Sequence, residues 1–597
     1  MSAKKKGTAV DPVTLSVVWN GLLNAIAACG DRVNFSAQSV LMGLMRDLGA
    51  ALLTAEGDLV CTGDFLPHHV FVSPIPTKHI LNKFGKLEPG DMVLANDGHI
   101  IQSGHLLDWT ILIPLYWHDE LVFYMHFRGH QIDSGGAYSG GYFPGTYDCY
   151  GEGLNIPPLK IIKKGILNEE LRELILNNVR TPAGVWNDVE LIRNSLLRMQ
   201  DDICRLIDTY GLETVKDCAA EMIKRDEMMV REQIKRLPEG TYYGEATADW
   251  DGTTPDKQVY IRVKLTVKGD EMTFDFSDTD DQVQFVNVPL GLTYACVFTA
   301  MFRVFDSLKT HGMRIPVHII APPGKVVNPT RPHTYGGCGC SCGTQIEEAI
   351  NHIWAQIIPE RAQGDPSRHF ASNASGRLPA IDPRTGSEQE YFQAPFMEEG
   401  GPGAVKGRDA WRPGGPVKRG SVEEQELVFP VRWDVMELLP DSEGAGEFTG
   451  TGGAYGERVC TAPPGARTFL QTGDVSGCTT PRYGVAGAAM IPPSTLHLLR
   501  AGKKEKDVIK AIDVYELHNG DVLYTEAYGG GGWGNPLNRD PEKVKKSVIA
   551  GLISFERARN VYGVVLTQQD RENPETISVD YKATEELRNK AKKAPKR

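Results

Sequence analysis

The chain has 597 residues, more than one hydrophobic core usually serves, so its length predicts about two to four domains. Its hydrophobic content of 41% and charged content of 23% are typical of a globular protein. The net charge of −12 and the pI of about 5.7 argue against a nucleic-acid surface, which needs a basic field.

The N-terminus and the cysteines give no sign of export. The sequence has no run of 18 or more apolar residues, and the lysines of MSAKKKGTAV have no apolar segment behind them. We therefore expect neither a spanning helix nor a secretory signal, and a cytoplasmic location. The 11 cysteines are too sparse for the disulfide framework of a small secreted domain.

The first elements are predicted as a helix and a pair of strands. Residues 11–32 carry apolar side chains at helical spacing, and Asp11 and Pro12 suit the start of a helix. Residues 45–60 predict two short strands around a turn. Asp47 precedes the first strand and is a candidate general base if burial raises its pKa. A salt-bridged turn residue is the alternative, and the residues alone favour it.

Two His-x-x-Asp pairs flank a predicted hairpin. The β-rich runs DWTILIPLYW and ELVFYMHF follow each other with only two residues between them. His105 and Asp108 lead into this hairpin, and His130 and Asp133 lead out of it. Because an antiparallel pair brings its entry and exit together, all four side chains are expected at one place.

These residue types suit a divalent transition metal. Histidine nitrogen and carboxylate oxygen are its usual ligands, and a site of two histidines and one carboxylate leaves coordination positions open for a substrate. The alternative is that the histidines are satisfied core residues and the aspartates are turn residues. On the residues alone the two interpretations stay evenly balanced.

The hairpin is followed by a long irregular loop, residues 134–151, rich in glycine and tyrosine. Long loops inside compact domains are usually functional. Its aromatic side chains either wall an apolar substrate pocket or only fix the loop, and we leave both open. They are Tyr138, Tyr142, Phe143, Tyr147 and Tyr150.

Periodicity predicts the rest of the chain only coarsely. We expect helices at 168–236, a β-meander at 240–278, helices at 291–308 and 345–358, loops and short strands at 362–420, a β-rich stretch at 427–530, and a frayed, lysine-rich tail at 576–597. No phosphate-binding GxxxxGK[ST] loop occurs.

Three closely spaced cysteines lie in GGCGCSCG. Thiolates of Cys338, Cys340 and Cys342 could converge on a metal, but CxCxC is not the CxxC spacing of zinc knuckles. A glycine-rich turn of reduced cysteines is the favoured interpretation.

The predicted fold class is α+β, a large multi-layer protein with mixed and antiparallel sheets and a helical segment near residues 168–236. The predicted domains are a disordered N-terminus at 1–10, a metal-binding and catalytic region at 11–236, a β-rich region at 237–345, a mixed α/β region with glycine-rich loops at 346–566, and a charged tail at 567–597.

Strings along the whole chain resemble one family. They include RDLGAALLTAEGDLV, EPGDMVLANDG followed by HLLD, GHQIDSGG, EGLNIPPLKI and GGGGWGNPLNRDPEKV. On these strings the chain resembles the hydantoinase B/oxoprolinase family, which includes large subunits of ATP-dependent ketone carboxylases. The family's cyclic-amide hydrolases typically have NDP and GGTH where this sequence has NDG and QSGH. The GGYFPGTYD segment resembles the acetone and acetophenone carboxylase branch.

The resemblance implies a metal site. In acetone-type carboxylases two histidines and one aspartate hold a divalent metal, and these positions correspond to His105, Asp108 and His130 here. Asp133 would then orient a ligand imidazole. The expected ion is manganese, zinc or iron, with magnesium accompanying ATP.

The carboxylase branch also implies a partner and a reaction. A hydantoinase A-like subunit would bind ATP, and a small accessory subunit can join the complex. The partner would activate bicarbonate and the ketone, and this chain would hold the enolate at the metal for carboxylation by bicarbonate-derived CO2. Asp47, or Glu152, would remove the α-proton.

Two other functions remain open. The chain can be the subunit of an ATP-dependent cyclic-amide hydrolase acting on a hydantoin, 5-oxoproline or a lactam, with Asp47 activating water. It can also be a scaffold subunit without catalysis.

Overall fold

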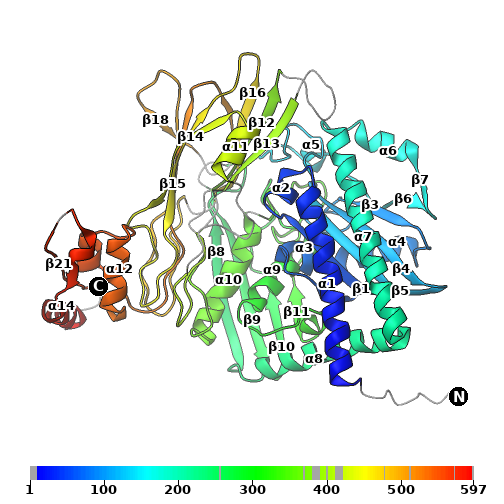
Figure 1. Cartoon of the computed structure of the whole chain (residues 1–597), viewed down its shortest axis with the longest axis horizontal. Coiled ribbons are helices and arrows are strands. Elements are labelled where there is room, and N and C mark those ends of the chain that lie inside the picture. The colour runs from blue at the N-terminus through cyan, green and yellow to red at the C-terminus, as the bar shows by residue number, and fades with distance from the viewer. Residues whose placement is uncertain are drawn as a thin grey trace.

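The structure is a computed structural model that describes residues 10–254, 257–339, 341–367, 370–379, 390–397, 401–410, 421–475, 478–509, 513–570 and 572–593. Over these residues the chain is an α+β protein with five sheets, which confirms the predicted fold class (Figure 1).

The N-terminal part contains long helices and one large sheet. Its elements are α1 Pro12–Ser36, α2 Val40–Gly43, β1 Leu48–Thr54, β2 Leu59–Thr62, α3 Pro67–Phe71, α4 Pro74–Phe84, β3 Met92–Ala95, β4 Asp108–Trp117, β5 Glu120–His130, α5 Cys149–Glu152, β6 Leu159–Lys163, β7 Ile166–Leu167, α6 Glu169–Leu176, α7 Pro182–Tyr210 and α8 Leu212–Ile234. The predicted first helix, strand pair, hairpin and helical segment are all confirmed. Asp11 caps α1 by accepting a hydrogen bond from the Thr14 amide.

This first sheet has the strand order β2-β1-β5-β4-β3-β6-β7, with antiparallel neighbours throughout. A two-residue turn joins β4 to β5, and His118 takes a positive φ of 52° there. The register of the hairpin sets Asp108 directly opposite His130.

Both faces of β5 are covered, which explains why almost every residue of the strand is buried. On one face α3 packs so closely that a Cβ on Gly49 of β1 would lie 2.7 Å from the His69 Cβ. Arg128 pairs with Gly49 and therefore points toward α3 as well. A Cβ on the next residue, Gly129, would collide with Met42 of α2, so α2 covers the opposite face.

The middle of the chain adds a second sheet and two buried helices. Its elements are β8 Gly240–Ala248, β9 Val259–Lys268, β10 Glu271–Asp275, α9 Leu290–Phe302, β11 Val317–Ile320 and α10 Cys342–Ile357. The strand order is β11-β10-β9-β8, and α10 packs on β8, β9 and α9. Helix α9 also packs on α3, which links this sheet to the first one.

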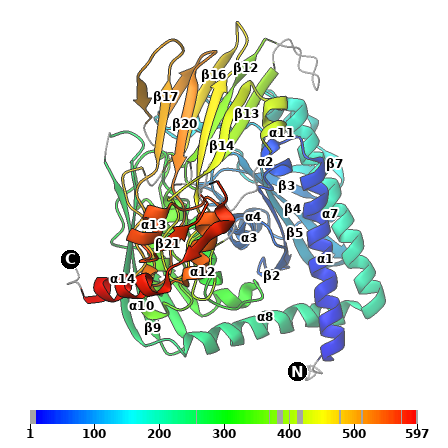
Figure 2. The same cartoon turned by 60° about the vertical axis from the view of Figure 1, so that its left-hand side comes forward.

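The C-terminal part is mainly β-structure (Figure 2). Its elements are β12 Phe370–Leu378, β13 Glu390–Met397, α11 Val422–Val428, β14 Val431–Leu439, β15 Gly453–Cys460, β16 Arg467–Val475, β17 Thr495–Leu499, β18 Lys506–Val508, β19 Asp513–Leu517, β20 Val522–Ala527, α12 Pro541–Ile549, α13 Phe555–Asn560, β21 Leu566–Gln568, β22 Ile577–Val579 and α14 Tyr581–Lys593. The sheets β13-β12-β16-β19 and β14-β15-β20-β17-β18 form the upper lobe of Figure 1, named here the C-terminal lobe.

The prediction of a frayed tail at 576–597 is wrong for its described residues. Residues 581–593 form α14, and Arg588 donates hydrogen bonds to the carbonyls of Tyr562 and Arg539. The many charged residues of this stretch made its helical spacing difficult to recognise in the sequence. Packing against preceding residues stabilises a helix that its composition alone did not indicate.

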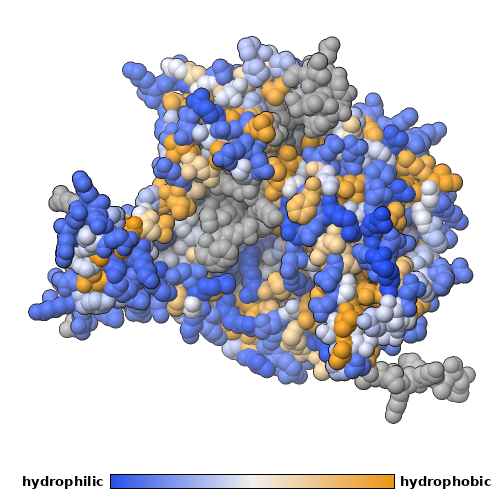
Figure 3. Space-filling model, viewed as in Figure 1, coloured by the Kyte–Doolittle hydropathy of each residue, from blue (hydrophilic) through white to orange (hydrophobic). Residues whose placement is uncertain are grey.

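Helix α1 is long and apolar enough to cross a membrane by length and composition. Its buried residues, among them Leu22 and Ile26, belong to the main core, and the helix packs against α7, α8 and β1. Val13, Val17 and Phe35 of this helix are exposed. Apolar residues also appear on the face of the molecule drawn in Figure 3. The packing is that of a core helix.

Candidate metal centre

Two histidines and one aspartate meet where the β4–β5 hairpin opens. Asp108 begins β4, and His130 ends β5 directly opposite it. His105 lies on the preceding loop, with its ring centroid 4.9 Å from that of His130. One ligand atom from each residue lies within 4.8 Å of the other two, and all three side chains are buried. The hairpin thus produces the expected fold-back.

The cluster contains buried polar atoms without a hydrogen bond. They are both ring nitrogens of His130 and the Oδ1 oxygen of Asp108, although Oδ1 lies 3.4 Å from His130 Nδ1. An unsatisfied buried polar group costs about 1–3 kcal/mol. A divalent cation accepting lone pairs from imidazole and carboxylate would remove this cost, so the donor set fits such an ion.

A backbone carbonyl orients His105. The Nδ1 atom lies 3.0 Å from the Gly336 carbonyl oxygen, so Nδ1 carries a proton and donates it there. The Nε2 atom then faces Asp108 Oδ2 at 3.0 Å. Burial lowers the pKa of His105, but the Asp108 charge and the Gly336 carbonyl outweigh burial and raise it overall. A cation would take the place of the proton on Nε2.

Arg128 holds the aspartate from the other side. Its guanidinium donates to Asp108 Oδ2 and, through Nη1, to the His68 carbonyl at 3.1 Å. Burial raises the pKa of Asp108, but Arg128 leads the charges that bring it well below its ordinary value. A Cβ on Gly104 would collide with the guanidinium, and the φ of +139° there also favours glycine.

Asp47 lies beside the ligands on a loop that leads into β1. Its Oδ2 atom is 3.5 Å from His130 Nδ1, and its Oδ1 atom is 2.6 Å from His69 Nε2. The sequence makes Asp47 a candidate general base only if burial raises its pKa. Burial does act in that direction, but hydrogen bonding and charge from His69 and the His130 charge outweigh it, and the pKa of Asp47 is lowered. Asp47 is therefore an ionised carboxylate at neutral pH.

Glu152 is the candidate carboxylate with a raised pKa. Burial raises its pKa to about 8, although the amides of Tyr335 and Gly336 act in the opposite direction. These amides donate to its carboxyl group at 3.0 and 2.6 Å. Glu152 thus anchors the loop whose Gly336 carbonyl orients His105.

The structure contradicts the expected contact of Asp133 with a ligand imidazole. Its carboxylate accepts hydrogen bonds from the Arg180 amide and guanidinium and from the Gly135 amide. None of its described hydrogen bonds involves His105 or His130. Asp133 lies three residues beyond the end of β5, so the hairpin register does not extend to it, and it contacts Arg180 instead.

The aromatic loop contributes one side chain to the centre. Tyr142 is buried, with its ring centroid 5.6 Å from that of His105 and 6.2 Å from that of His130. Tyr138 contacts Phe143 and Phe469, which ties the loop to the C-terminal lobe. The side chains of Tyr147 and Tyr150 are exposed and wall no pocket at the centre.

The cysteine-rich turn lies beside the centre. Cys338 is buried, and burial, together with the nearby charge of Asp108, raises the pKa of its thiol. Cys342 is buried at the start of α10. Cys340 lies outside the described residues, so the question of a shared metal does not extend to it.

Sequence reasoning missed Arg128, His69 and Gly104, which hold the ligands and Asp47. The dipeptide His68–His69 after Pro67 was a visible signal, and so was the alternation of His126, Arg128 and His130 along one strand. Polar side chains at every second position of a buried strand share one face. That pattern indicates a site.

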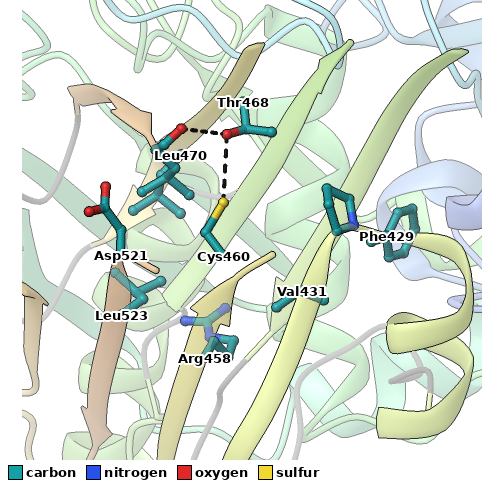
Figure 4. Close-up of a pocket in the computed structure, with 10 residues that line it drawn as sticks. Phe429, Val431, Arg458, Cys460, Thr468, Leu470, Asp521 and Leu523 are labelled. Carbon is teal, nitrogen blue, oxygen red and sulfur yellow. Dashed lines mark hydrogen bonds between the residues drawn. The ribbon is translucent and has the colours of Figure 1, made fainter. Parts of the chain in front are cut away.

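Two described cavities differ in their relation to this centre. One of about 340 Å³ is lined by Arg46, which precedes Asp47, by Pro67 and Val70 of α3, and by Lys309. The other, of about 30 Å³, lies in the C-terminal lobe, where Cys460 and Thr468 face each other among apolar side chains (Figure 4). The first is the candidate access route; the second has room for about one water.

The fold and the centre define a class: a large α+β protein with a two-histidine, one-aspartate ligand set at the open end of an antiparallel hairpin. The family model described as Hydantoinase B/oxoprolinase matches residues 11–536, and the chain belongs to this family. The predicted family is therefore confirmed.

Individual relatives within the family differ in how similar they are to this chain. The caprolactamase subunit beta of Pseudomonas jessenii is 28% identical over 571 residues, covering 93% of this chain and 96% of that protein. The acetophenone carboxylase delta subunit of Aromatoleum aromaticum is 25% identical and covers 88% of this chain and 82% of that protein. The crystal structure of the ATP-dependent caprolactamase from Pseudomonas jessenii superposes with a TM-score of 0.85 at 26% identity, covering 98% of this chain and all of that one (100%). The carboxylase branch suggested by GGYFPGTYD is thus the more distant of the two.

Proposed function

We propose that this chain is the metal-binding subunit of an ATP-dependent hydrolase of cyclic amides, a lactam or a hydantoin-like ring. The observation that carries the proposal is the buried cluster of His105, Asp108 and His130, with unpaired ligand atoms and an ionised Asp47 at its edge. Similarity to a caprolactamase subunit along nearly the whole chain supports this reaction over ketone carboxylation.

The metal ligands, Asp47 and His69 have different roles in the proposed hydrolysis. A divalent cation held by the three ligands would supply Lewis acidity at the ring carbonyl. Asp47, with 15% of its side chain exposed, is positioned to accept a proton from an attacking water. His69 holds one oxygen of Asp47, so only the other oxygen is directed toward His130.

Several groups keep this arrangement fixed. Arg128 neutralises Asp108 and the Gly336 carbonyl sets the tautomer of His105. Tyr142 covers the two imidazoles and limits the access of water to them. Nucleotide binding is assigned to a hydantoinase A-like partner, because the sequence contains no phosphate-binding loop of the GxxxxGK[ST] type.

The test uses the full chain co-expressed with a hydantoinase A-like subunit from the same organism. The complex is screened for ATP hydrolysis with caprolactam, hydantoin and 5-oxoproline, with and without bicarbonate. We expect ATP-dependent ring opening that needs no bicarbonate. Turnover only with bicarbonate and a methyl ketone would instead support a carboxylase. Metal content and activity that both survive His130→Ala would show that the site as drawn is wrong.

A further inference from the structure

A second group of ligating side chains lies near the first, and the proposed hydrolysis does not use it. It consists of His68 on α3, Cys296 on α9 and Glu347 on α10. One ligand atom from each lies within 4.8 Å of the other two. Cys296 and Glu347 are buried and His68 is partly buried. Only the packing of three helices distant in sequence brings them together.

Cys296 and Glu347 both approach the same ring nitrogen of His68. His68 Nε2 lies 2.6 Å from a carboxylate oxygen of Glu347, Oε1, and 3.6 Å from the Cys296 Sγ. In a nucleophile–histidine–acid triad the thiol and the acid would use opposite ring nitrogens. Convergence on one nitrogen is instead the arrangement of ligands around a common centre.

The Nε2 atom cannot form an ordinary hydrogen bond with both partners at the same time. Nε2 carries either one proton or one lone pair, so it cannot donate to the ionised Glu347 and also accept from the Cys296 thiol. Burial raises the pKa of Cys296 well above its ordinary value, so the thiol keeps its proton in the cation-free protein. A divalent cation would accept a lone pair from each residue and release the thiol proton to solvent.

The surroundings already hold the carboxylate in place. Arg303 binds Oε2 of Glu347, which leaves Oε1 facing His68. This outer contact restricts the carboxylate to one orientation, as outer contacts do at established metal sites. The guanidinium also offsets the carboxylate charge, so the thiolate would supply the negative charge that attracts the ion.

We propose that His68, Cys296 and Glu347 bind a second divalent cation, with Zn²⁺ as the expected ion because the set combines thiolate, imidazole and carboxylate. The ion would hold α3 against α9 and α10. It would thereby position two contacts of the first centre: His69 with Asp47, and the His68 carbonyl with Arg128. Its role is positional, and the proposal does not depend on the reaction assigned to the first centre.

Cobalt substitution distinguishes the two centres, because only the second contains sulfur. The full chain, in complex with its partner subunit, is stripped of metal and titrated with Co²⁺ under a non-chelating reductant. We expect two equivalents to bind and a thiolate-to-cobalt charge-transfer band to appear. Cys296→Ser should abolish the band and reduce the metal content to one equivalent. Cys338→Ser, which changes another buried cysteine nearby, should retain both the band and the two equivalents.

Further variants keep the test decisive. His130→Ala should lose one equivalent and keep the band, so failure of the first centre is distinguished from failure of the second. If Cys296→Ser does not fold, His68→Gln takes its place with the same expected loss. Hydrogen exchange at residues 67–71 should also accelerate when the second ion is absent. A wild-type protein that shows no thiolate band, or a band lost in Cys338→Ser, would overturn the proposal.

Discussion

The first sheet and the C-terminal lobe both bury polar side chains between antiparallel strands, but Thr468 and Asp521 of the lobe are hydrogen-bonded whereas the His130 ring of the first sheet is not. In the lobe, Thr468 Oγ1 donates to the Leu517 carbonyl at 2.6 Å and lies 3.7 Å from Cys460 Sγ. Asp521 accepts hydrogen bonds from Arg500, among other groups. At the β4–β5 hairpin, by contrast, His130 keeps both ring nitrogens without a hydrogen bond.

This difference between the two regions indicates where the functional site lies. The small apolar cavity of the lobe is a packing gap, and Thr468 beside it forms a hydrogen bond with the Leu517 carbonyl (Figure 4). The hairpin region keeps buried ligand atoms without hydrogen bonds, although this lowers the stability of the fold. Buried polar groups without partners need an explanation, and a ligand that binds there is one. A cluster of unpaired ligand atoms is therefore a better guide to the functional site than the presence of a cavity.

His130→Ala should have the largest effect. It removes one of three ligands, so we expect loss of the bound cation at this centre and at least a 10³-fold loss of ATP-dependent ring opening, roughly the order expected when a catalytic unit fails. Metal analysis and steady-state kinetics of the complex test this. Unchanged metal content would remove the hairpin from consideration as a metal centre.

Asp47→Asn should separate proton transfer from metal binding. We expect kcat to fall by about 10²–10⁴-fold, because the amide cannot accept a proton at neutral pH. The metal content should remain that of the wild type, since Asp47 is outside the ligand set. Wild-type kcat would show that another group is the base, with Glu152 next to be tested.

Leu470→Ala should affect stability without affecting the centre. Leu470 is fully buried beside the small cavity of the lobe, and removing its side chain enlarges that space. We expect a loss of about 2–5 kcal/mol in the free energy of unfolding, measured by urea denaturation where the transition is reversible. Metal content and kcat should match the wild type below the transition, and a fall in metal content would contradict the separation of the two regions.

Glu152→Gln should produce the smallest effect, a change in pH dependence. The pKa of Glu152 is raised from 4.5 to about 8, so between these values the folded protein binds a proton that the unfolded chain has released. This group therefore makes the protein less stable as pH rises through that window. The variant, which can still accept hydrogen bonds from the Tyr335 and Gly336 amides, should lose this slope in thermal melts from pH 5 to 8. An unchanged slope would show that Glu152 titrates normally.

Local patterns correctly predicted the hairpin and the meeting of His105, Asp108 and His130. The alternating and β-branched residues of DWTILIPLYW and ELVFYMHF predicted two strands. Because only two residues separate them, the second strand had to return antiparallel to the first. Register then placed Asp108 opposite His130. The same reasoning failed at Asp133, because the strand ends at His130 and nothing local determines where the next side chains point.

The pKa of Asp47 shows a second limit. The sequence left open whether burial raises this pKa, and α3 supplies the His69 contact that leads the causes lowering it. Gly336 is a comparable case, since the contact of its carbonyl with His105 joins segments 231 residues apart in the chain. Pairwise electrostatics depends on distances that composition does not contain.

The sequence by itself determined the strands, the long helices and the family, because these follow from periodicity and from short strings that the chain carries along its length. Tertiary structure alone decided which side chains meet: α3 reaching Asp47, the Gly336 carbonyl reaching His105, and three helices bringing His68, Cys296 and Glu347 together. The physical reason is that periodicity is local along the chain, whereas charge, hydrogen bonding and metal coordination act through space.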